Sequence, residues 1–245
     1  MINIRITIEY DGKDFNGWQK QPTKLNIQGE IERAIEIITG EKVDVIGSGR
    51  TDAGVNALAQ VANFKVSELK IPVDRLIYAI NSQLKKTIRI IKAEIVDDSF
   101  HSRYAAKKKT YRYTINNSIA GSAIYRNMQY HYPFKLDEVK MNEGAKYFIG
   151  EHDFKAFKAS GTSSKSSVRK IYDANVYRDG DLINIELTGN GFLYNMVRII
   201  AGTLLEVGEG KINPKAIEDI IKDGSRKNAG KTLPPSGLCL VSVEY

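Results

Sequence analysis

Residues 49–57 read Gly-Arg-Thr-Asp-Ala-Gly-Val-Asn-Ala, and they follow a short apolar run from Val43 to Ile46. Glycine adopts backbone angles that other residues avoid, and it lets another molecule approach the backbone closely. A loop of this kind beside a strand end holds Arg50 and Asp52 at fixed positions, and functional side chains often lie on such loops. The same composition also fits a tight turn in which both charges are only solvated. The nine residues alone do not decide between the two.

The wider sequence supports a functional loop. GRTDAGVNA resembles the signature GRTDAGVHA of the tRNA pseudouridine synthase A family, and Asp52 falls on that family's catalytic aspartate. Further segments resemble the family's other motifs in family order: YDG and GWQ (10–12, 17–19), FHSR (100–103), KTYRY (109–113), GEHDF (150–154) and FLYNMVR (192–198). These matches cover nearly the whole chain, and together they are far more specific than any one of them. Asn56 departs from the signature, which has histidine there.

Composition indicates an ordinary globular protein. The chain has 245 residues, which suits one large domain or two small ones, and 42% of them are hydrophobic. The apolar runs are too short to cross a bilayer, and residues 1–10 alternate instead of forming a signal-peptide core. We therefore expect a cytoplasmic protein with no membrane partner. The single cysteine, Cys239, excludes an internal disulfide, and its apolar neighbours predict a buried strand thiol.

The charge distribution favours a polyanionic partner. The net charge is +7, and basic residues gather in one stretch interleaved with tyrosines: Arg103, Lys107, Lys108, Lys109 and Arg112 with Tyr104, Tyr111 and Tyr113. Such a run suits phosphate contact combined with base stacking. The alternative is a solvated edge strand protected by lysines. A second basic stretch, the Ser- and Gly-rich loop 159–167 with Lys165 and the following Arg169, suits closure over an RNA backbone or an ordinary surface loop.

Periodicity predicts two similar halves. The first half reads as a strand at 4–10, a helix from Ile27 capped by Asn26 and ended by Gly40, and a strand from Val43. A strand at 60–64, a helix at 73–83 and a strand at 88–96 follow. This order is typical of a ferredoxin-like unit.

The second half repeats the pattern without a sequence repeat. Strands are expected at 110–115 and 128–132, then a helix at 136–148 with Val139, Ala145 and Phe148 on one side. Asp179-Gly180 predicts a hairpin between strands 168–177 and 182–187, and helices at 193–207 and after Pro214 precede a strand at 238–243. We expect an α+β fold of two ferredoxin-like, RRM-like halves with antiparallel sheets, residues 1–104 and 105–245. The family resemblance implies that the sheets face a common basic cleft.

The resemblance also implies the chemistry. Isomerising uridine to pseudouridine breaks the bond from uracil N1 to ribose C1′ and joins C5 to C1′, with no redox change and no cofactor. A carboxylate such as Asp52 would act as nucleophile or as general base, and Arg50 or a more distant cation would favour its ionised form. Tyr111 falls on the family's active-site tyrosine and would stack on the uracil, unless it is a strand tyrosine with its ring in the core. Arg198 falls on the family's basic residue. One alternative is a cation at the helix surface, but the apolar residues around Arg198 favour a buried partner, and Asp52 is the candidate.

Partners and alternatives follow from the same residues. The resemblance implies a homodimer that binds the tRNA anticodon arm and modifies positions 38–40. The alternative functions are a catalytically silent RNA-binding module that acts as a tRNA chaperone, and a metal-dependent nuclease that uses Asp11, Asp14 and Asp52. His101, His131 and His152 lack metal-ligand spacing, so we expect no metal site. Asn56 either ties the loop together or contacts RNA, and in the second case the preferred uridines would differ from the family's.

Overall fold

The computed structural model describes residues 1–161 and 166–245 of the chain, so the predicted RNA-binding residue Lys165 lies outside the described residues. The chain forms two compact units. Unit 1 comprises Met1–Lys107 together with Leu240–Tyr245, and unit 2 comprises Lys108–Cys239. The last six residues therefore belong with the first unit. Among the described residues, no helix is long and apolar enough to cross a membrane.

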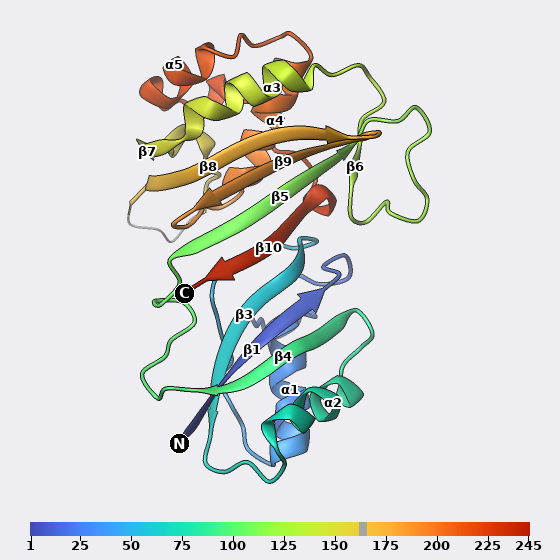
Figure 1. Ribbon diagram of the computed structural model, residues 1–245, viewed down its shortest axis with the longest axis vertical. Helices are drawn as coiled ribbons and strands as arrows, with labels where there is room; N and C mark the ends of the chain where they lie inside the picture. Colours follow the sequence, from blue (N-terminus) through green and yellow to red (C-terminus); the bar gives the residue numbers. More distant parts are fainter. Residues whose placement is uncertain (162–165) are drawn as a thin grey trace. The chain divides into compact units, whose positions relative to one another are not determined.

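Unit 1 is an antiparallel sheet with two helices on one face (Figure 1). Its strands are ordered β4 (Ile88–Val96), β1 (Ile2–Tyr10), β3 (Asn56–Val66) and β10 (Leu238–Glu244), of which residues 240–244 belong to this unit. The short β2 (Ile46–Gly47) is also paired to β3. The helices are α1 (Ile27–Thr39) and α2 (Val73–Gln83). Alternation along β1 buries Ile4, Ile6 and Ile8 completely, because period-2 side chains point to one face of a sheet. The elements β1, β3, β4 and α2 confirm the predicted strands at 4–10, 60–64 and 88–96 and the predicted helix at 73–83.

Local sequence sets both ends of α1. Asn26 has an extended backbone, and its side chain accepts a hydrogen bond of 2.8 Å from the N–H of Gly29, which satisfies one of the unpaired donors of the first turn. Gly40 adopts a left-handed conformation with φ 77°, and its N–H donates to the carbonyl of Glu36. The helix thus begins and ends where the sequence predicted.

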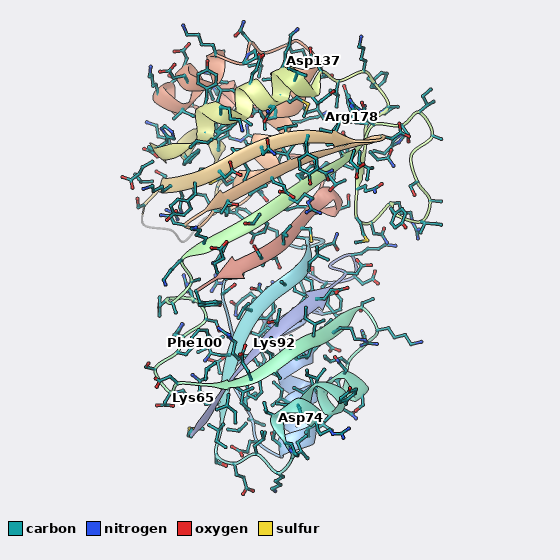
Figure 2. The ribbon with its side chains drawn as sticks, viewed as in Figure 1. Lys65, Asp74, Lys92, Phe100, Asp137 and Arg178 are labelled. Atoms are coloured by element: carbon teal, nitrogen blue, oxygen red, sulfur yellow. The ribbon has the colours of Figure 1, made fainter. Side chains whose placement is uncertain are left out.

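Unit 2 has the same two-layer arrangement. Its sheet is ordered β5 (Lys108–Asn116), β9 (Leu182–Gly189), β8 (Val168–Asp179) and β7 (Gly150–Asp153), all antiparallel, while β6 (Tyr130–His131) pairs with β5 in parallel. The helices α3 (Glu138–Ala145), α4 (Met196–Gly208) and α5 (Ala216–Asp223) form the second layer, with α3 packed on β8 and α4 on β5 (Figure 1). The β8–β9 hairpin turns at Gly180, as predicted. Near this turn Arg178 reaches the start of α3, where its Nη2 lies 3.0 Å from Glu138 Oε2 (Figure 2).

The fold is mixed α+β with mostly antiparallel strands, as the sequence indicated, but three local predictions were wrong. The strand expected from Val43 begins only at Ile46, because the N–H of Val45 donates to the buried carboxylate of Glu32 at 3.2 Å instead of to a neighbouring strand. Val139 is exposed, since the buried face of α3 is formed by Met141, Gly144 and Ala145. Cys239 is only half-buried in β10.

Candidate active site

Asp52 lies at the first corner of a tight turn between β2 and β3. Ala53 and Gly54 form the turn, the N–H of Val55 donates to the carbonyl of Asp52 at 3.1 Å, and Gly54 has φ 77°. Glycine adopts this left-handed conformation without the steric cost that a Cβ brings. Asp52 is half-buried, so this residue remains partly accessible to solvent within the turn.

The segment that follows β1 holds this turn on both sides of Asp52. The N–H of Trp18 donates to the carbonyl of Thr51 at 3.0 Å, and the N–H of Gly54 donates to the carbonyl of Phe15 at 3.3 Å. Tyr10 Oη and Thr51 Oγ1 form a buried hydrogen bond of 2.7 Å. These bonds fix the backbone immediately before and shortly after Asp52. The YDG and GWQ motifs therefore act, in structural terms, as the support of the aspartate loop.

Two glycines of this support segment are required by close approach of the loop. A Cβ on Gly12 would lie 2.0 Å from the carbonyl oxygen of Val55, and a Cβ on Gly17 would lie 2.5 Å from the carbonyl oxygen of Thr51. Gly17 also has φ 81°. No other residue fits either position without moving the aspartate loop, because real Cβ atoms do not come within 3.0 Å of backbone atoms.

Arg50 is exposed beside this loop. Its Nε donates a hydrogen bond of 2.8 Å to Oε1 of Gln19, the last residue of the GWQ motif. The contact with Gln19 was not predicted from the sequence, and the only signal for a role of Gln19 was its place in the GWQ motif. The predicted influence of Arg50 on the ionisation of Asp52 stays a prediction.

Tyr111 lies in β5 of unit 2 and is 8% exposed. Its ring meets Phe192 edge-on, with 5.2 Å between the ring centroids and 81° between the planes. Tyr111 lies on the same face of β5 as the fully buried Tyr113 and Ile115, because side chains two residues apart in a strand point to the same side, so its ring faces the core side of the strand. This is the packing of a strand tyrosine, and uracil stacking by Tyr111 stays a prediction.

Arg198 is half-buried in the first turn of α4 and is held by two acceptors. Its Nε donates to the carbonyl of Leu233 at 2.7 Å, and its Nη1 donates to Asn195 Oδ1 at 2.7 Å. Asn195, which precedes α4, has φ 61°, a left-handed conformation that asparagine tolerates better than most residues. The surface-cation alternative does not describe this geometry. The predicted pairing with Asp52, a residue of unit 1, stays a prediction.

The predicted RNA-binding residues differ in their surroundings. Arg103, Lys107 and Lys108 are exposed, and Lys109 is half-buried. Lys108 Nζ lies 5.6 Å from the ring centroid of Tyr172, and the Arg103 guanidinium lies 5.9 Å from that of Tyr104. Arg103 and Lys108 thus lie next to aromatic rings, a combination that suits contact with RNA.

Two other arginines near this stretch are more strongly engaged. Arg169 Nη1 donates to the carbonyls of Ser166 and Val168 at 3.0 and 2.6 Å, and burial lowers the pKa of its guanidinium. Arg112 Nε lies 2.6 Å from Glu186 Oε1. Burial alone would lower the pKa of Arg112, but the hydrogen bond and charge of Glu186 outweigh it, so the pKa is raised. Because Glu186 compensates its charge, Arg112 contributes less than the sequence suggested to attraction of a polyanion.

Comparison with known proteins agrees with these motifs. A family model described as tRNA pseudouridine synthase matches residues 6–105 and 145–245. This chain belongs to the tRNA pseudouridine synthase family. It is 52% identical to a tRNA pseudouridine synthase A of Acetivibrio thermocellus and 53% identical to one of Caldicellulosiruptor saccharolyticus, over 100% of both chains in each case. A tRNA pseudouridine synthase A 2 of Clostridium perfringens is 50% identical over the same full length. The residues that the family model matches include the segments that hold the Asp52 turn and the start of α4.

Each unit has an open cavity, and the described residues contain no cluster typical of a metal site. Within residues 1–161 and 166–245, no group of three or more His, Cys, Asp or Glu side chains is arranged to hold a metal ion. A cavity of about 380 Å³ in unit 1 is lined in part by Lys65 and Phe100, both labelled in Figure 2. A cavity of about 520 Å³ in unit 2 is lined in part by Arg126 and Tyr130. Asp52 lines neither of them.

Proposed function

We infer that this protein is an isomerase that converts uridine to pseudouridine in tRNA, with Asp52 as the catalytic carboxylate. The observation that carries the inference is the Asp52 turn, in a chain that belongs to this family over its full length. Backbone hydrogen bonds at Thr51 and Gly54 and two obligatory glycines hold the backbone on either side of the half-buried Asp52. Such pre-positioning is what a catalytic group needs in order to meet a reacting carbon repeatedly in the same geometry.

The reaction requires little besides a placed carboxylate and a pocket for the base. The N1–C1′ bond breaks, the detached uracil turns, C5 bonds to C1′, and the proton on C5 is released while N1 gains one. Asp52 supplies an oxygen that attacks C1′ or removes a sugar proton. The target nucleotide leaves its stack to be reached, and contacts from the protein offset the lost stacking. Arg50, Tyr111 and Arg198 are the proposed substrate-binding residues.

The proposed substrate is the anticodon arm of tRNA, at positions 38–40, bound without a cofactor by a homodimer. We further propose that two ferredoxin-like halves, residues 1–104 and 105–245, present their sheets to a common basic cleft. Arg103, Lys107, Lys108, Lys109, Lys165 and Arg169 are the proposed backbone-binding residues of that cleft. The exposed Lys108 beside the Tyr172 ring and the exposed Arg103 beside the Tyr104 ring support this proposal. A tRNA substrate also implies a cytoplasmic location.

One assay tests the function directly. Unmodified tRNA labelled with tritium at uridine C5 is incubated with the protein in EDTA, and tritium released to water is measured. Release accompanied by pseudouridine at positions 38–40 is the expected result, because C5 exchanges its hydrogen for the bond to C1′. Intact, unmodified RNA that nevertheless binds would favour the chaperone alternative. RNA cleavage that appears only when a divalent metal replaces EDTA would favour the nuclease.

A further inference from the structure

A chain of amide hydrogen bonds connects Arg50 to the buried start of α1. Arg50 Nε donates to Gln19 Oε1 at 2.8 Å, and Gln19 Nε2 donates to Gln28 Oε1 at 2.9 Å. Gln28 Nε2 in turn donates to Glu32 Oε1 at 2.9 Å. Gln28 and Glu32 are each only 6% exposed, whereas Arg50 is exposed. Three side chains thus lead from the protein interior to an exposed cation beside the Asp52 loop.

The inner end of this chain fixes the direction of every bond in it. Gln28 Oε1 also accepts from the backbone N–H of Lys20 at 3.0 Å, and a backbone N–H can only donate. Glu32 accepts a hydrogen bond from the Gln28 amide through a carboxylate oxygen. Glu32 also accepts a hydrogen bond of 2.6 Å from Lys20 Nζ, and this bond raises the pKa of Lys20. The amide of Gln28 therefore has one permitted orientation, with its oxygen toward Gln19.

That orientation determines what Gln19 presents to Arg50. Because Gln28 offers an oxygen, Gln19 must turn its NH₂ group inward, and its own oxygen then faces outward. An arginine has five N–H donors and no acceptor, so it binds the oxygen side of an amide and not the nitrogen side. A freely rotating glutamine would face Arg50 with either side of its amide. Fixing a long exposed side chain such as Arg50 costs rotamer entropy, which the bond to a correctly oriented Gln19 offsets.

We propose that Gln28 and Gln19 are positioning residues, which orient the Arg50 guanidinium for the substrate by fixing the polarity of this amide chain. The proposal rests on the proposed function in so far as Arg50 contacts the RNA. Neither glutamine touches the reacting atoms, and both act through Arg50. A carboxylate at position 19 offers oxygens on both sides, so it can accept from Arg50 without being oriented by Gln28. A Gln19→Glu substitution therefore tests the proposal.

The test uses the full-length protein with tRNA and compares kcat/KM among four variants. Gln28→Met has a similar volume and no amide, so it is expected to lower kcat/KM about five- to tenfold, the effect of one lost hydrogen bond. Gln19→Glu alone is expected to lower it as well, because two oxygens then face each other at Gln28. The Gln28→Met/Gln19→Glu double variant is expected to recover to near the wild-type value. Gln83→Met, the same change at the end of α2, is the control and is expected to match wild type.

A purely structural role for Gln28 predicts the opposite pattern. Destabilisation of α1 would not be repaired by a carboxylate at position 19, so a double variant no better than Gln28→Met overturns the proposal, as does a Gln28→Met variant with full activity. Melting curves accompany each variant. If Gln28→Met does not fold, Gln19→Met removes the same link at a half-buried position and is expected to show the same loss in kcat/KM.

A second readout separates this proposal from the proposed function. The order parameter of the Arg50 Nε–H bond, measured by ¹⁵N relaxation and assigned with Arg50→Lys, reports how firmly the guanidinium is held. It is expected to fall in Gln28→Met and to recover in the double variant. If wild-type protein makes no pseudouridine, the proposed function fails while this measurement still decides the amide chain. An unchanged order parameter in Gln28→Met overturns the positioning role.

Discussion

Asn56 Oδ1 accepts a hydrogen bond of 2.9 Å from the backbone N–H of Gly12, which joins the end of the aspartate loop to the turn after β1. Both residues are buried. Asn56 stands where the family signature has histidine, and a neutral imidazole nitrogen can accept the same bond. Of the two roles considered from the sequence, the structure shows the loop tie. The departure from the family motif therefore preserves the support of Asp52.

Removing this tie is expected to destabilise the protein. Asn56→Ala leaves the buried N–H of Gly12 without its acceptor, which typically costs about 1–3 kcal/mol. The free energy of unfolding, measured by urea denaturation, checks the expected loss. Asn16→Ala is the control, because Asn16 is exposed on the same support segment. Equal stability of the two variants would show that the Asn56 bond contributes little.

A histidine at this position is expected to make stability depend on pH. The imidazole must be neutral to accept from Gly12, so folding would lower its pKa below the unfolded value of about 6.5. The stability that the bond contributes is then present above about pH 6.5 and is lost as the pH falls below it. Denaturation of Asn56→His and wild type at pH 8 and pH 5.5 measures this, and the variant is expected to lose more stability on acidification. An identical pH dependence of the two proteins would contradict it.

Gly17 and Gly40 form a matched pair for testing the support of the aspartate loop. Their φ angles are 81° and 77°, but a Cβ on Gly17 meets Thr51 at 2.5 Å, whereas a Cβ on Gly40 meets nothing within 4 Å. Gly40→Ala is expected to cost about 1–2 kcal/mol from backbone strain alone. Gly17→Ala is expected to cost more and also to lower turnover on tRNA, because the loop must shift. Equal losses in both variants would mean that the loop tolerates the displacement.

Asp52→Asn is expected to abolish turnover while leaving tRNA affinity largely intact. An amide has nearly the shape of a carboxylate but acts as neither nucleophile nor base, and loss of such a group appears in turnover more than in binding. Tritium release, tRNA binding and a melting curve are measured together, with Asp14→Asn as a control on the exposed neighbouring segment. A folded Asp52→Asn protein that turns over at the wild-type rate would remove Asp52 from the mechanism. If the variant unfolds, Asp52→Glu keeps the charge and moves the carboxylate by one methylene, and low turnover is again expected.

The exposed Lys107, just before β5, and Lys108, its first residue, are expected to contact phosphate. Replacing Lys107 and Lys108 with glutamine should lower the slope of log affinity against log salt by about 0.9 for each phosphate that the protein no longer neutralises. Filter binding of tRNA over a range of salt concentrations gives this slope. Lys85→Gln/Lys86→Gln removes two exposed charges from the connection between α2 and β4 and should leave the slope close to that of wild type. The same slope for both double variants would place Lys107 and Lys108 away from the RNA.

The sequence by itself determined the elements whose signals are local. Asn26 and Gly40 delimit α1 because a side-chain cap and a left-handed glycine act within a few residues of the helix ends. The β8–β9 hairpin follows from its turn residues, and the alternation of β1 follows from the period of a strand. The motifs around Asp52 likewise identified the family without any coordinates, because a joint match in order along the whole chain does not depend on geometry.

Only the tertiary structure decided what each of these residues contacts. The N–H of Val45 pairs with Glu32, which shortened the expected strand, and Glu186 compensates the charge of Arg112. The need for glycine at Gly17 comes from a carbonyl more than thirty positions away, and the orientation of Gln19 comes from Gln28 and the N–H of Lys20. Such constraints come from atoms that only folding brings together, so no pattern of neighbouring residues encodes them. Local propensity determines where the helices and strands lie along the chain. The geometry of the site depends on close approach and hydrogen-bond direction between segments that are distant in the sequence.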